Sequence, residues 1–278
     1  VRGLVSGGPA ARELGASEFR PRLDDLVLTA DNRELLDELV VRVRRKKQVL
    51  DGWGFRDVVG PQVGVAALFH GPPGTGKSMA AYAISTHLGV ECLRVDLSQV
   101  ISKWVGETEK SLARVFEAAE RSDALLLFDE ADALFTRRTD VKSSNDRYAN
   151  LEVNFLLQRI ESFPGLAVLT TNHVASIDGA FLRRLAIQVR FDYPDAAERL
   201  LLWRRKLPAG APLDESVSLE DFAQRYAMTG ARIRNAALRA AFFAAEAGGA
   251  ITAEHLERAV IAEWRASGIT PGATRHLE

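Results

Sequence analysis

Short apolar runs alternate with longer stretches of helical periodicity through the first two thirds of the chain. The run from Val65 to Phe69 is apolar without alternation and ends close to a glycine, which is typical of a strand buried on both faces of a parallel sheet. Four further runs have strand character: Val90 to Val95, Ala124 to Phe128, Leu166 to Asn172 and Ile187 to Phe191. Strands separated by helices predict the α/β class, with a five-stranded parallel sheet flanked by helices.

Residues 31–50 have a helical pattern ahead of the first strand. Asp31 and Glu34 stand at capping-box spacing, and one face carries the apolar side chains of Leu35, Leu39, Val40 and Val43. The C-terminal end is basic, where cations complement the helix dipole; its residues are Arg42, Arg44, Arg45, Lys46 and Lys47. We interpret this cluster as a solvated helix face, with a nucleic-acid patch as the alternative.

The strand-like runs stop near residue 195, and helical patterns follow over 195–207, 219–226, 231–247 and 252–266. These patterns predict a small all-helical second domain. We therefore expect a linker or tail over 1–20, a large α/β domain over 21–194, a helical lid over 195–268 and a tail over 269–278 that ends in a cloning scar. A further N-terminal domain ahead of Val1 stays an open alternative.

Composition narrows the class of protein only a little. The chain has 278 residues, of which 47% are hydrophobic, and a net charge of −1. That charge gives no global reason to bind nucleic acid or an anionic membrane, and no apolar stretch reaches the length of a membrane span. The single cysteine, Cys92, lies in a strand-like run and cannot form an internal disulfide, so a buried inert thiol and a cytoplasmic location are expected.

A glycine-rich segment between the first strand and the next helix carries the strongest chemical signal. Eight residues fit the pattern G-x-x-x-x-G-K-[ST]: Gly71, Pro72, Pro73, Gly74, Thr75, Gly76, Lys77 and Ser78. We include the next residue, Met79, in the candidate nucleotide site. A strand, a glycine loop and a helix N-terminus aim backbone N–H groups at one point, which suits a polyphosphate. Lys77 is expected to reach the β- and γ-phosphates, and the Ser78 hydroxyl to ligate Mg²⁺.

Two adjacent carboxylates, Asp129 and Glu130, follow the third strand-like run. In a parallel sheet, catalytic residues lie at the carboxyl ends of strands. Asp129 is expected to hold Mg²⁺ or its water, while Glu130 polarises a water for attack on the γ-phosphate of ATP. The alternative is a polar cap on a buried strand.

Residues 22–266 resemble the AAA+ ATPases. Gly71 to Ser78 resembles the Walker A motif of the AAA branch, and Leu126 to Asp132 resembles its Walker B motif with a trailing Ala-Asp. Thr170-Thr171-Asn172 matches the sensor-1 strand, where the resemblance implies that Asn172 helps to orient the attacking water. The same resemblance implies a P-loop NTPase fold, ATP and Mg²⁺ as ligands, and a homo-oligomeric ring of six subunits.

A second group of motifs concerns what such a ring acts on. Lys103-Trp104-Val105-Gly106 resembles the first pore loop of members that thread proteins, which implies an exposed aromatic finger that grips a polypeptide. The alternative is that Trp104 packs into the core.

Arginines late in the ATPase domain resemble those that reach the nucleotide of a neighbouring subunit. The segment from Ile177 to Arg184 resembles the approach to them, although the usual continuation is absent, so Arg184 is our first candidate and Arg183 the second. Surface salt bridging is the alternative for either arginine. Gly230 to Asn235 resembles the sensor-2 segment, which implies that Arg232 contacts the phosphates; a plain surface arginine is the alternative.

The sequence therefore predicts an ATP-hydrolysing ring motor that remodels, threads or assembles a protein partner. Similarity of Lys103 to Lys110, Asp146 to Asn150 and Phe181 to Arg184 to AAA proteins of phage-tail-like contractile injection systems implies an assembly role there. The alternatives are a nucleic-acid-directed ATPase and a nucleotide-gated scaffold with little turnover.

Overall fold

The computed structural model describes residues 11–12, 20–60, 64–96, 108–132, 155–174, 177 and 179–266. Its internal contacts divide the chain into two units. The first comprises Val1–Gly71 and Lys77–Phe191, and the second comprises Pro72–Gly76 and Asp192–Glu278. Most of the glycine-rich segment therefore groups with the C-terminal helices.

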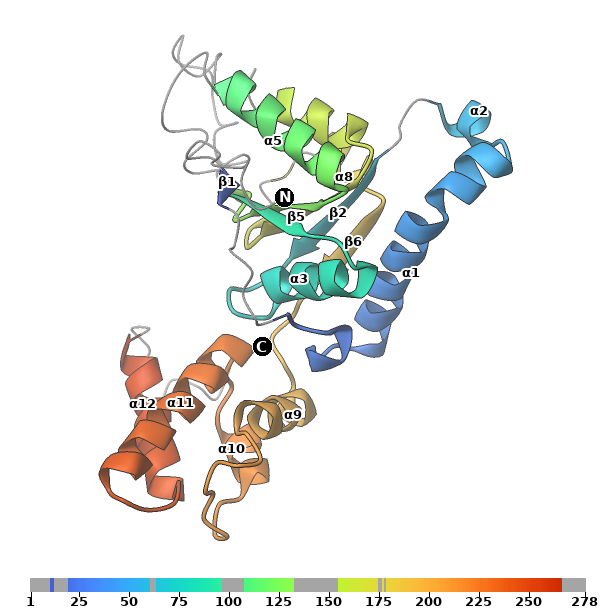
Figure 1. Cartoon of the computed structure of the whole chain (residues 1–278). Helices are drawn as coiled ribbons and strands as arrows, with labels where there is room; N and C mark the ends of the chain where they lie inside the picture. The colour runs from blue at the N-terminus through green and yellow to red at the C-terminus, as the bar shows by residue number, and fades with distance from the viewer. Residues whose placement is uncertain are drawn as a thin grey trace. The chain divides into compact units, whose positions relative to one another are not determined.

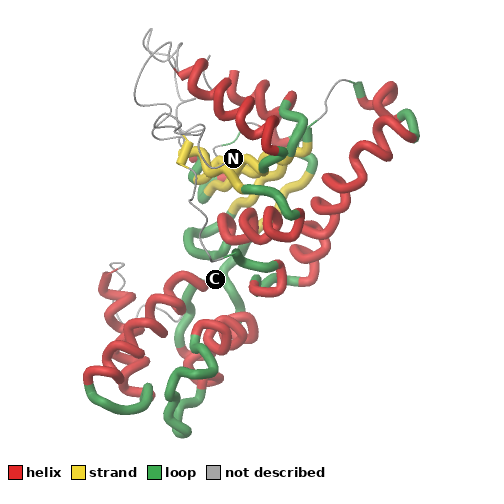
Figure 2. Tube along the Cα trace, in the orientation of Figure 1, coloured by secondary structure: helices red, strands yellow, loops and turns green. Residues whose placement is uncertain are grey.

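The first unit contains the predicted parallel sheet (Figures 1 and 2). Its strand order is β1-β3-β4-β5-β2-β6, and every pairing among β2 to β6 is parallel. These strands are β2 (Val65–His70), β3 (Cys92–Asp96), β4 (Leu125–Asp129), β5 (Leu166–Thr171) and β6 (Ile187–Arg190). A two-residue strand, β1 (Ala11–Arg12), pairs antiparallel with β3 and lies within the segment that we expected to be a linker. The five predicted parallel strands and the α/β class are confirmed.

Helices cover both faces of the sheet because its strands are apolar on both sides. Alternate residues of β2 enter different cores: Leu68 joins Phe116 and Phe163, whereas Phe69 joins Leu36 and Ile84. The helices of this unit are α1 (Ala30–Lys47), α2 (Phe55–Val59), α3 (Lys77–Leu88), α5 (Thr108–Ser122), a helix over 155–162 and α8 (Gly179–Leu182). A 3₁₀ turn (Leu23–Asp25) precedes α1 and a π-helical turn (Gln48–Gly52) follows it.

The start of α1 corrects the capping prediction. Thr29 is the N-cap, and its hydroxyl accepts a hydrogen bond from the backbone N–H of Asn32 at 3.2 Å. Asp31 instead lies in the first turn, where an acid complements the helix dipole. Threonine and aspartate both cap helices well. Because the helix begins at Ala30, the residue directly before it, Thr29, is the cap.

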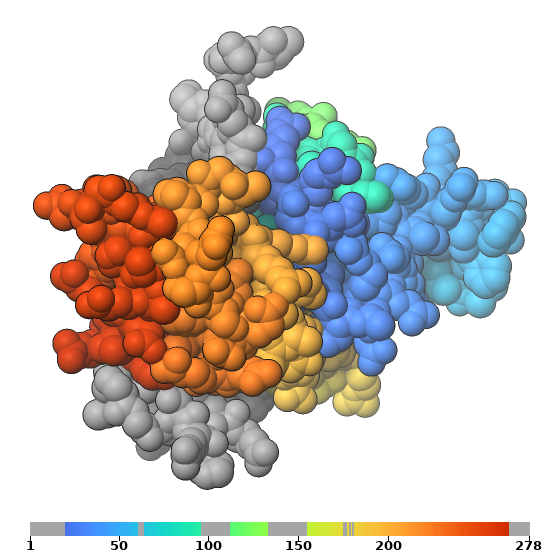
Figure 3. All heavy atoms as spheres, turned by 90° about the horizontal axis from the view of Figure 1, so that it is seen from below, coloured from blue at the N-terminus to red at the C-terminus, as the bar shows by residue number. Residues whose placement is uncertain are grey.

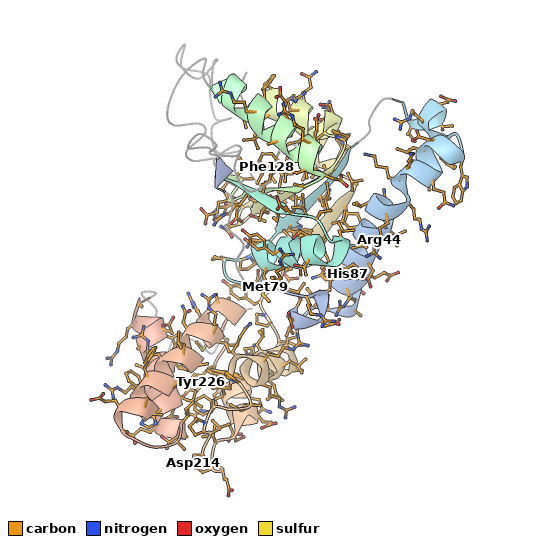
Figure 4. All side chains as sticks on the ribbon, in the orientation of Figure 1. Arg44, Met79, His87, Phe128, Asp214 and Tyr226 are labelled. Carbon is orange, nitrogen blue, oxygen red and sulfur yellow. The ribbon has the colours of Figure 1, made fainter. Side chains whose placement is uncertain are left out.

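The basic end of α1 is used partly for packing within the first unit. Arg42 pairs with Glu38 at 2.7 Å, and Lys46 donates to the carbonyl of Pro164. Arg44 donates to the carbonyl of His87 at 2.9 Å, and Figure 4 shows these two residues close together between α1 and α3. These contacts support the interpretation of a structural and solvated face. Figure 3 shows α1 and α2, in blue, at the molecular surface.

The second unit consists of α9 (Ala196–Lys206), α10 (Leu219–Arg225), α11 (Gly230–Glu246) and α12 (Ala253–Ala266). A capping box begins α9: Asp195 accepts from the backbone N–H of Glu198 at 2.7 Å, and Glu198 accepts from that of Asp195 at 2.9 Å. Trp203 and Trp264 are buried in the apolar core of this unit, as is Tyr226, which Figure 4 labels. None of the helices in the described part of the chain combines the length and apolar character that a membrane crossing needs.

Candidate nucleotide-binding site

The glycine-rich segment begins where β2 ends and finishes in the first turn of α3. Gly71 has φ 134°, and a Cβ atom there would lie 2.0 Å from the carbonyl oxygen of Phe191, so only glycine fits. Gly76 also has a positive φ, 109°, and a Cβ atom there would meet nothing within 4 Å. Thr75 donates its hydroxyl to the carbonyl of Pro72 at 2.8 Å, which stabilises the turn. These features are compatible with the predicted phosphate-binding loop, and binding of phosphate there stays a prediction.

Lys77 is the first residue of α3, and its side chain reaches back to Gly71, the residue after β2. Its Nζ donates to the carbonyl of Gly71 at 2.8 Å and to Oδ1 of Asn172 at 2.9 Å. Burial lowers the pKa of Lys77, and the nearby carboxylates, led by Asp132, oppose that shift. The ammonium therefore lies at the end of β5, close to the predicted sensor asparagine.

Asp129 is the centre of a buried polar group at the end of β4. Its Oδ1 accepts hydrogen bonds from the hydroxyls of Ser78, at 2.7 Å, and Thr170, at 2.6 Å. Its Oδ2 pairs with Arg94 of β3 at 2.8 Å, and only 9% of the carboxylate side chain is exposed. The predicted pair of Mg²⁺ ligands, Ser78 and Asp129, is therefore brought together.

This oxygen donor pair fits Mg²⁺. A magnesium ion bound with nucleotide phosphates usually takes only one or two protein ligands and keeps several waters. The described residues contain no group of three or more His, Cys, Asp or Glu side chains that could hold a metal ion by themselves.

Glu130 has a backbone conformation that is rare outside glycine, with φ 55°. Two hydrogen bonds to β5 hold it there: its N–H donates to the hydroxyl of Thr170 at 3.0 Å, and the N–H of Ala131 donates to the carbonyl of Thr170 at 2.8 Å. The Glu130 side chain is exposed. A strained, over-determined backbone beside an accessible carboxylate is a common feature of catalytic positions.

Asn172 directly follows β5 and completes this edge of the sheet. Besides Lys77, it contacts the carboxylate of Asp132, which also accepts hydrogen bonds from Thr171 and His173. The ends of β4 and β5 are thus tied together on either side of Glu130.

The two candidate arginines lie at and after the end of α8. Arg184 forms an ion pair with Glu161 at 2.8 Å, and 55% of its side chain is exposed. Arg183 donates through Nε to the carbonyl of Gly179 at 3.1 Å. Action of either arginine on a neighbouring subunit stays a prediction.

In the second unit, the start of α11 contacts the glycine-rich segment. The backbone N–H of Ala231 donates to the carbonyl of Gly74 at 3.1 Å. Gly74 has φ 78°, and a Cβ atom there would lie 2.9 Å from the Cβ of Ala231 and from the hydroxyl of Thr229. Arg232 follows Ala231 directly, in the first turn of α11; its contact with phosphates stays a prediction.

Comparison with known proteins agrees with this geometry. Residues 67–193 match the model of the family described as "ATPase family associated with various cellular activities (AAA)". Residues 67–193 form an AAA ATPase domain.

Three curated relatives illustrate the similarity of this chain to known proteins. It is 33% identical over 220 residues to an uncharacterised AAA family ATPase of Sinorhizobium fredii, covering 75% of this chain and 64% of the relative. It is 34% identical over 200 residues to proteasome-activating nucleotidase 2 of Halobacterium salinarum, with 68% and 47% covered. It is 32% identical over 175 residues to a 26S proteasome regulatory subunit 6B homolog of Dictyostelium discoideum, with 59% and 43% covered. The chain therefore spans less than two thirds of the length of the first relative and less than half of the length of the other two.

The AAA domain has polar contacts that the motifs did not identify. Arg94, Thr170 and Asp132 all contact predicted site residues. Thr170 and Asp132 belong to the sensor-1 and Walker B motifs. Their positions near the ends of strands could have identified them as site residues from the sequence. Arg94 has no such signal, since its contact depends on β3 lying next to β4.

The remaining residues singled out in the sequence are a methionine, the single cysteine and the pore-loop segment. Met79 packs partly buried against the apolar core around α1 and α3, and Figure 4 shows it on α3. Burial, with the nearby charge of Asp129, raises the pKa of the Cys92 thiol to about 12, which supports an inert thiol. The pore-loop residues Lys103, Trp104, Val105 and Gly106, and residues 146–150, lie outside the described residues.

Proposed function

We propose that this chain hydrolyses ATP with Mg²⁺ and uses the energy, as a homo-oligomeric ring of six subunits, to remodel or thread a protein partner. The observation that carries the proposal is the arrangement at one edge of the sheet. There Lys77 contacts Asn172 and Ser78 contacts Asp129. The exposed Glu130 directly follows Asp129. The AAA domain and its relatives support ATP hydrolysis as the reaction.

Each residue of this arrangement has a distinct task. The loop from Gly71 to Gly76 and the ammonium of Lys77 bind the phosphates, while Ser78 and Asp129 would hold Mg²⁺, which neutralises phosphate charge as it develops. Glu130 accepts a proton from the attacking water, and Asn172 orients that water towards the γ-phosphorus. A bond forms between the water oxygen and the γ-phosphorus while the bond between the γ-phosphorus and the β–γ bridging oxygen breaks, with the electron pair passing to ADP. ADP and inorganic phosphate leave, and Glu130 releases its proton to solvent.

The proposal of a ring and a protein substrate has separate support. Two of the relatives are named a proteasome-activating nucleotidase and a proteasome regulatory subunit homolog. Within a ring, Arg184 or Arg183 would stabilise transition-state charge on the nucleotide of a neighbour. Arg232, at the start of α11, would contact the phosphates from the helical unit. Assembly of a contractile injection system is a narrower proposal that rests on motif resemblance.

We further propose that the protein is cytoplasmic and acts on proteins rather than on nucleic acid. The net charge is −1, and the basic end of α1 makes the structural contacts described above. A ring that threads protein should be stimulated by an unfolded polypeptide and not by DNA. We therefore expect casein, but not single-stranded DNA, to raise the steady-state rate of phosphate release; the reverse result would favour a nucleic-acid-directed ATPase.

Replacement of Trp104 tests the threading part of the proposal. Trp104→Ala should keep ATP binding and basal hydrolysis while removing stimulation by casein, because an apolar finger grips the substrate without touching nucleotide. Trp53→Ala is a matched control, since Trp53 is an exposed tryptophan on the segment between α1 and α2. Equal stimulation of the Trp104 variant and the parent would contradict threading by this loop.

A further inference from the structure

Asp132 lies in the turn after β4, and its carboxylate faces the residues that follow β5. It accepts hydrogen bonds from the hydroxyl of Thr171 and from the backbone N–H groups of Asn172 and His173, the latter two at 3.1 Å. The side-chain amide of Asn172 also donates to it, at 3.4 Å. All four groups are donors, and the two acceptor oxygens of a carboxylate complement them.

The carboxamide of Asn172 is held from both ends. Its oxygen accepts from Nζ of Lys77 at 2.9 Å, while its nitrogen faces the carboxylate of Asp132. A flipped amide would place its NH₂ group against the ammonium and its oxygen against the carboxylate, and both contacts would be repulsive. Asp132 and Lys77 therefore select one orientation of Asn172.

The backbone contacts extend this control beyond one side chain. Because the carboxylate bonds two consecutive N–H groups, it fixes the path of the chain directly after β5, where the backbone leaves the sheet. Thr171, the third partner, is fully buried in the last position of β5. The same segment is therefore held at its buried end and at its exposed end by one acid.

We propose that Asp132 is a positioning residue for ATP hydrolysis, which acts by holding Asn172 in place against Lys77. The inference rests on the role of Asn172 in orienting the attacking water. Asp132 contacts neither the phosphates nor the water in this account. Loss of its contacts displaces Asn172 and slows the chemical step, because small errors in the position of a catalytic group cost a large share of the rate.

The variant Asp132→Asn tests the proposal with almost no change in volume. It turns one acceptor oxygen into a donor that faces N–H groups, so Asn172 loses its fixed position. We expect kcat to fall about tenfold while KM for ATP stays within about twofold, since the interaction matters in the transition state. Asp24→Asn is the matched control: Asp24 is exposed and pairs with Arg33, so this variant should keep parental kinetics.

A double-mutant cycle separates positioning from a general structural effect. In an Asn172→Ala background, Asp132→Asn should change kcat by less than about twofold, because the group that Asp132 positions is gone. Rate losses that multiply in the double variant would overturn the proposal. Full kcat in Asn172→Ala alone would instead overturn the role of Asn172, whereas a slow Asn172→Ala with a parental Asp132→Asn would overturn only the role of Asp132.

A second variant keeps the test valid if Asp132→Asn does not fold. Thr171→Val removes one donor to Asp132 with little change in shape. It also removes the hydroxyl that accepts from the N–H of His173 at 3.0 Å, but that N–H keeps its hydrogen bond to Asp132, as does Asn172. It should lower kcat by about twofold to threefold, and this loss should disappear in the Asn172→Ala background. Thermal unfolding and binding of a fluorescent ATP analogue establish that each variant is folded and binds nucleotide. Persistence of the Thr171→Val effect without Asn172 would contradict the proposal.

Discussion

The ends of β4 and β5 and the segment after α8 both contain charged residues predicted from the sequence, but they differ in burial and in their partners. Asp129 is 9% exposed and is held by Ser78, Thr170 and Arg94. Arg184 is 55% exposed and pairs with Glu161. A buried carboxylate with several donors has one arrangement, whereas a single ion pair whose arginine is more than half exposed is weaker and depends on one partner. The first region is thus preorganised within the chain, and the second has the exposed arginine that the proposed contact with a neighbouring subunit requires.

Arg184 should show the largest effect that separates the two regions. Arg184→Ala should lower the ATPase rate of the assembled ring by about a thousandfold while ATP binding is kept, since arginine fingers act in the transition state. Glu161→Gln removes the charge of the partner in the same ion pair and should stay within about threefold of the parent, because glutamine can still accept a hydrogen bond from the half-exposed Arg184. Phosphate release measures both.

Mixed rings test whether Arg184 acts on a neighbour. Arg184→Ala and Glu130→Gln subunits are each inactive alone, but a mixed ring contains sites that combine an intact Glu130 with an intact Arg184 from the next subunit. Mixing should therefore restore part of the ATPase rate. Failure of the mixture to recover activity would contradict action in trans, and a larger loss in Arg183→Ala would transfer the role to that residue.

Arg94 provides a smaller test of the buried region. Arg94→Ala removes a positive charge 2.8 Å from Asp129, so repulsion of a bound Mg²⁺ decreases. We expect the Mg²⁺ concentration for half-maximal binding of a fluorescent ATP analogue to fall by about twofold to fivefold, with partial exposure of Arg94 limiting the effect. Arg94→Lys keeps the charge and should resemble the parent. An increased requirement for Mg²⁺ in Arg94→Ala would mean that Arg94 mainly holds Asp129 in place.

The reactivity of the Cys92 thiol depends on the charge of Asp129, and its change is the smallest effect that we expect. Its pKa is raised to about 12, first by burial and then by Asp129, so the thiol stays protonated at neutral pH. Asp129→Asn removes the second cause, which should lower the pKa and increase the rate of alkylation by iodoacetamide at pH 8 by about twofold. Equal rates in the folded parent and variant would contradict this coupling, and both proteins should react equally when unfolded in guanidinium chloride.

The sequence predicted most elements of this fold closely because their apolar periodicity is local. The strand expected over 166–172 is Leu166–Thr171, and the helix expected over 252–266 is Ala253–Ala266. The cap of α1 was assigned wrongly, since Thr29 and Asp31 are both good caps and local sequence does not fix the first helical residue.

The sequence predicted the motif residues of the site but not the contacts that depend on the order of the strands. The motifs identified Lys77, Asp129 and Asn172, which the structure brings together. The contacts of Arg94 with Asp129 and of Asp132 with Asn172 join residues 35 and 40 positions apart, and they require β3, β4 and β5 to be neighbours in that order. Apolar periodicity carries no information about that order, so these partners could not be derived from it.

The rate of ATP hydrolysis by Glu130→Gln tests the central proposal most directly. Glu130 is an exposed carboxylate held beside Asp129, and its replacement should lower kcat by about a hundredfold or more with ATP binding unchanged, because the attacking water loses its base. Glu120→Gln alters an exposed glutamate of α5 and should keep the parental rate. A Glu130→Gln protein that releases phosphate as fast as the parent would contradict the account of this site.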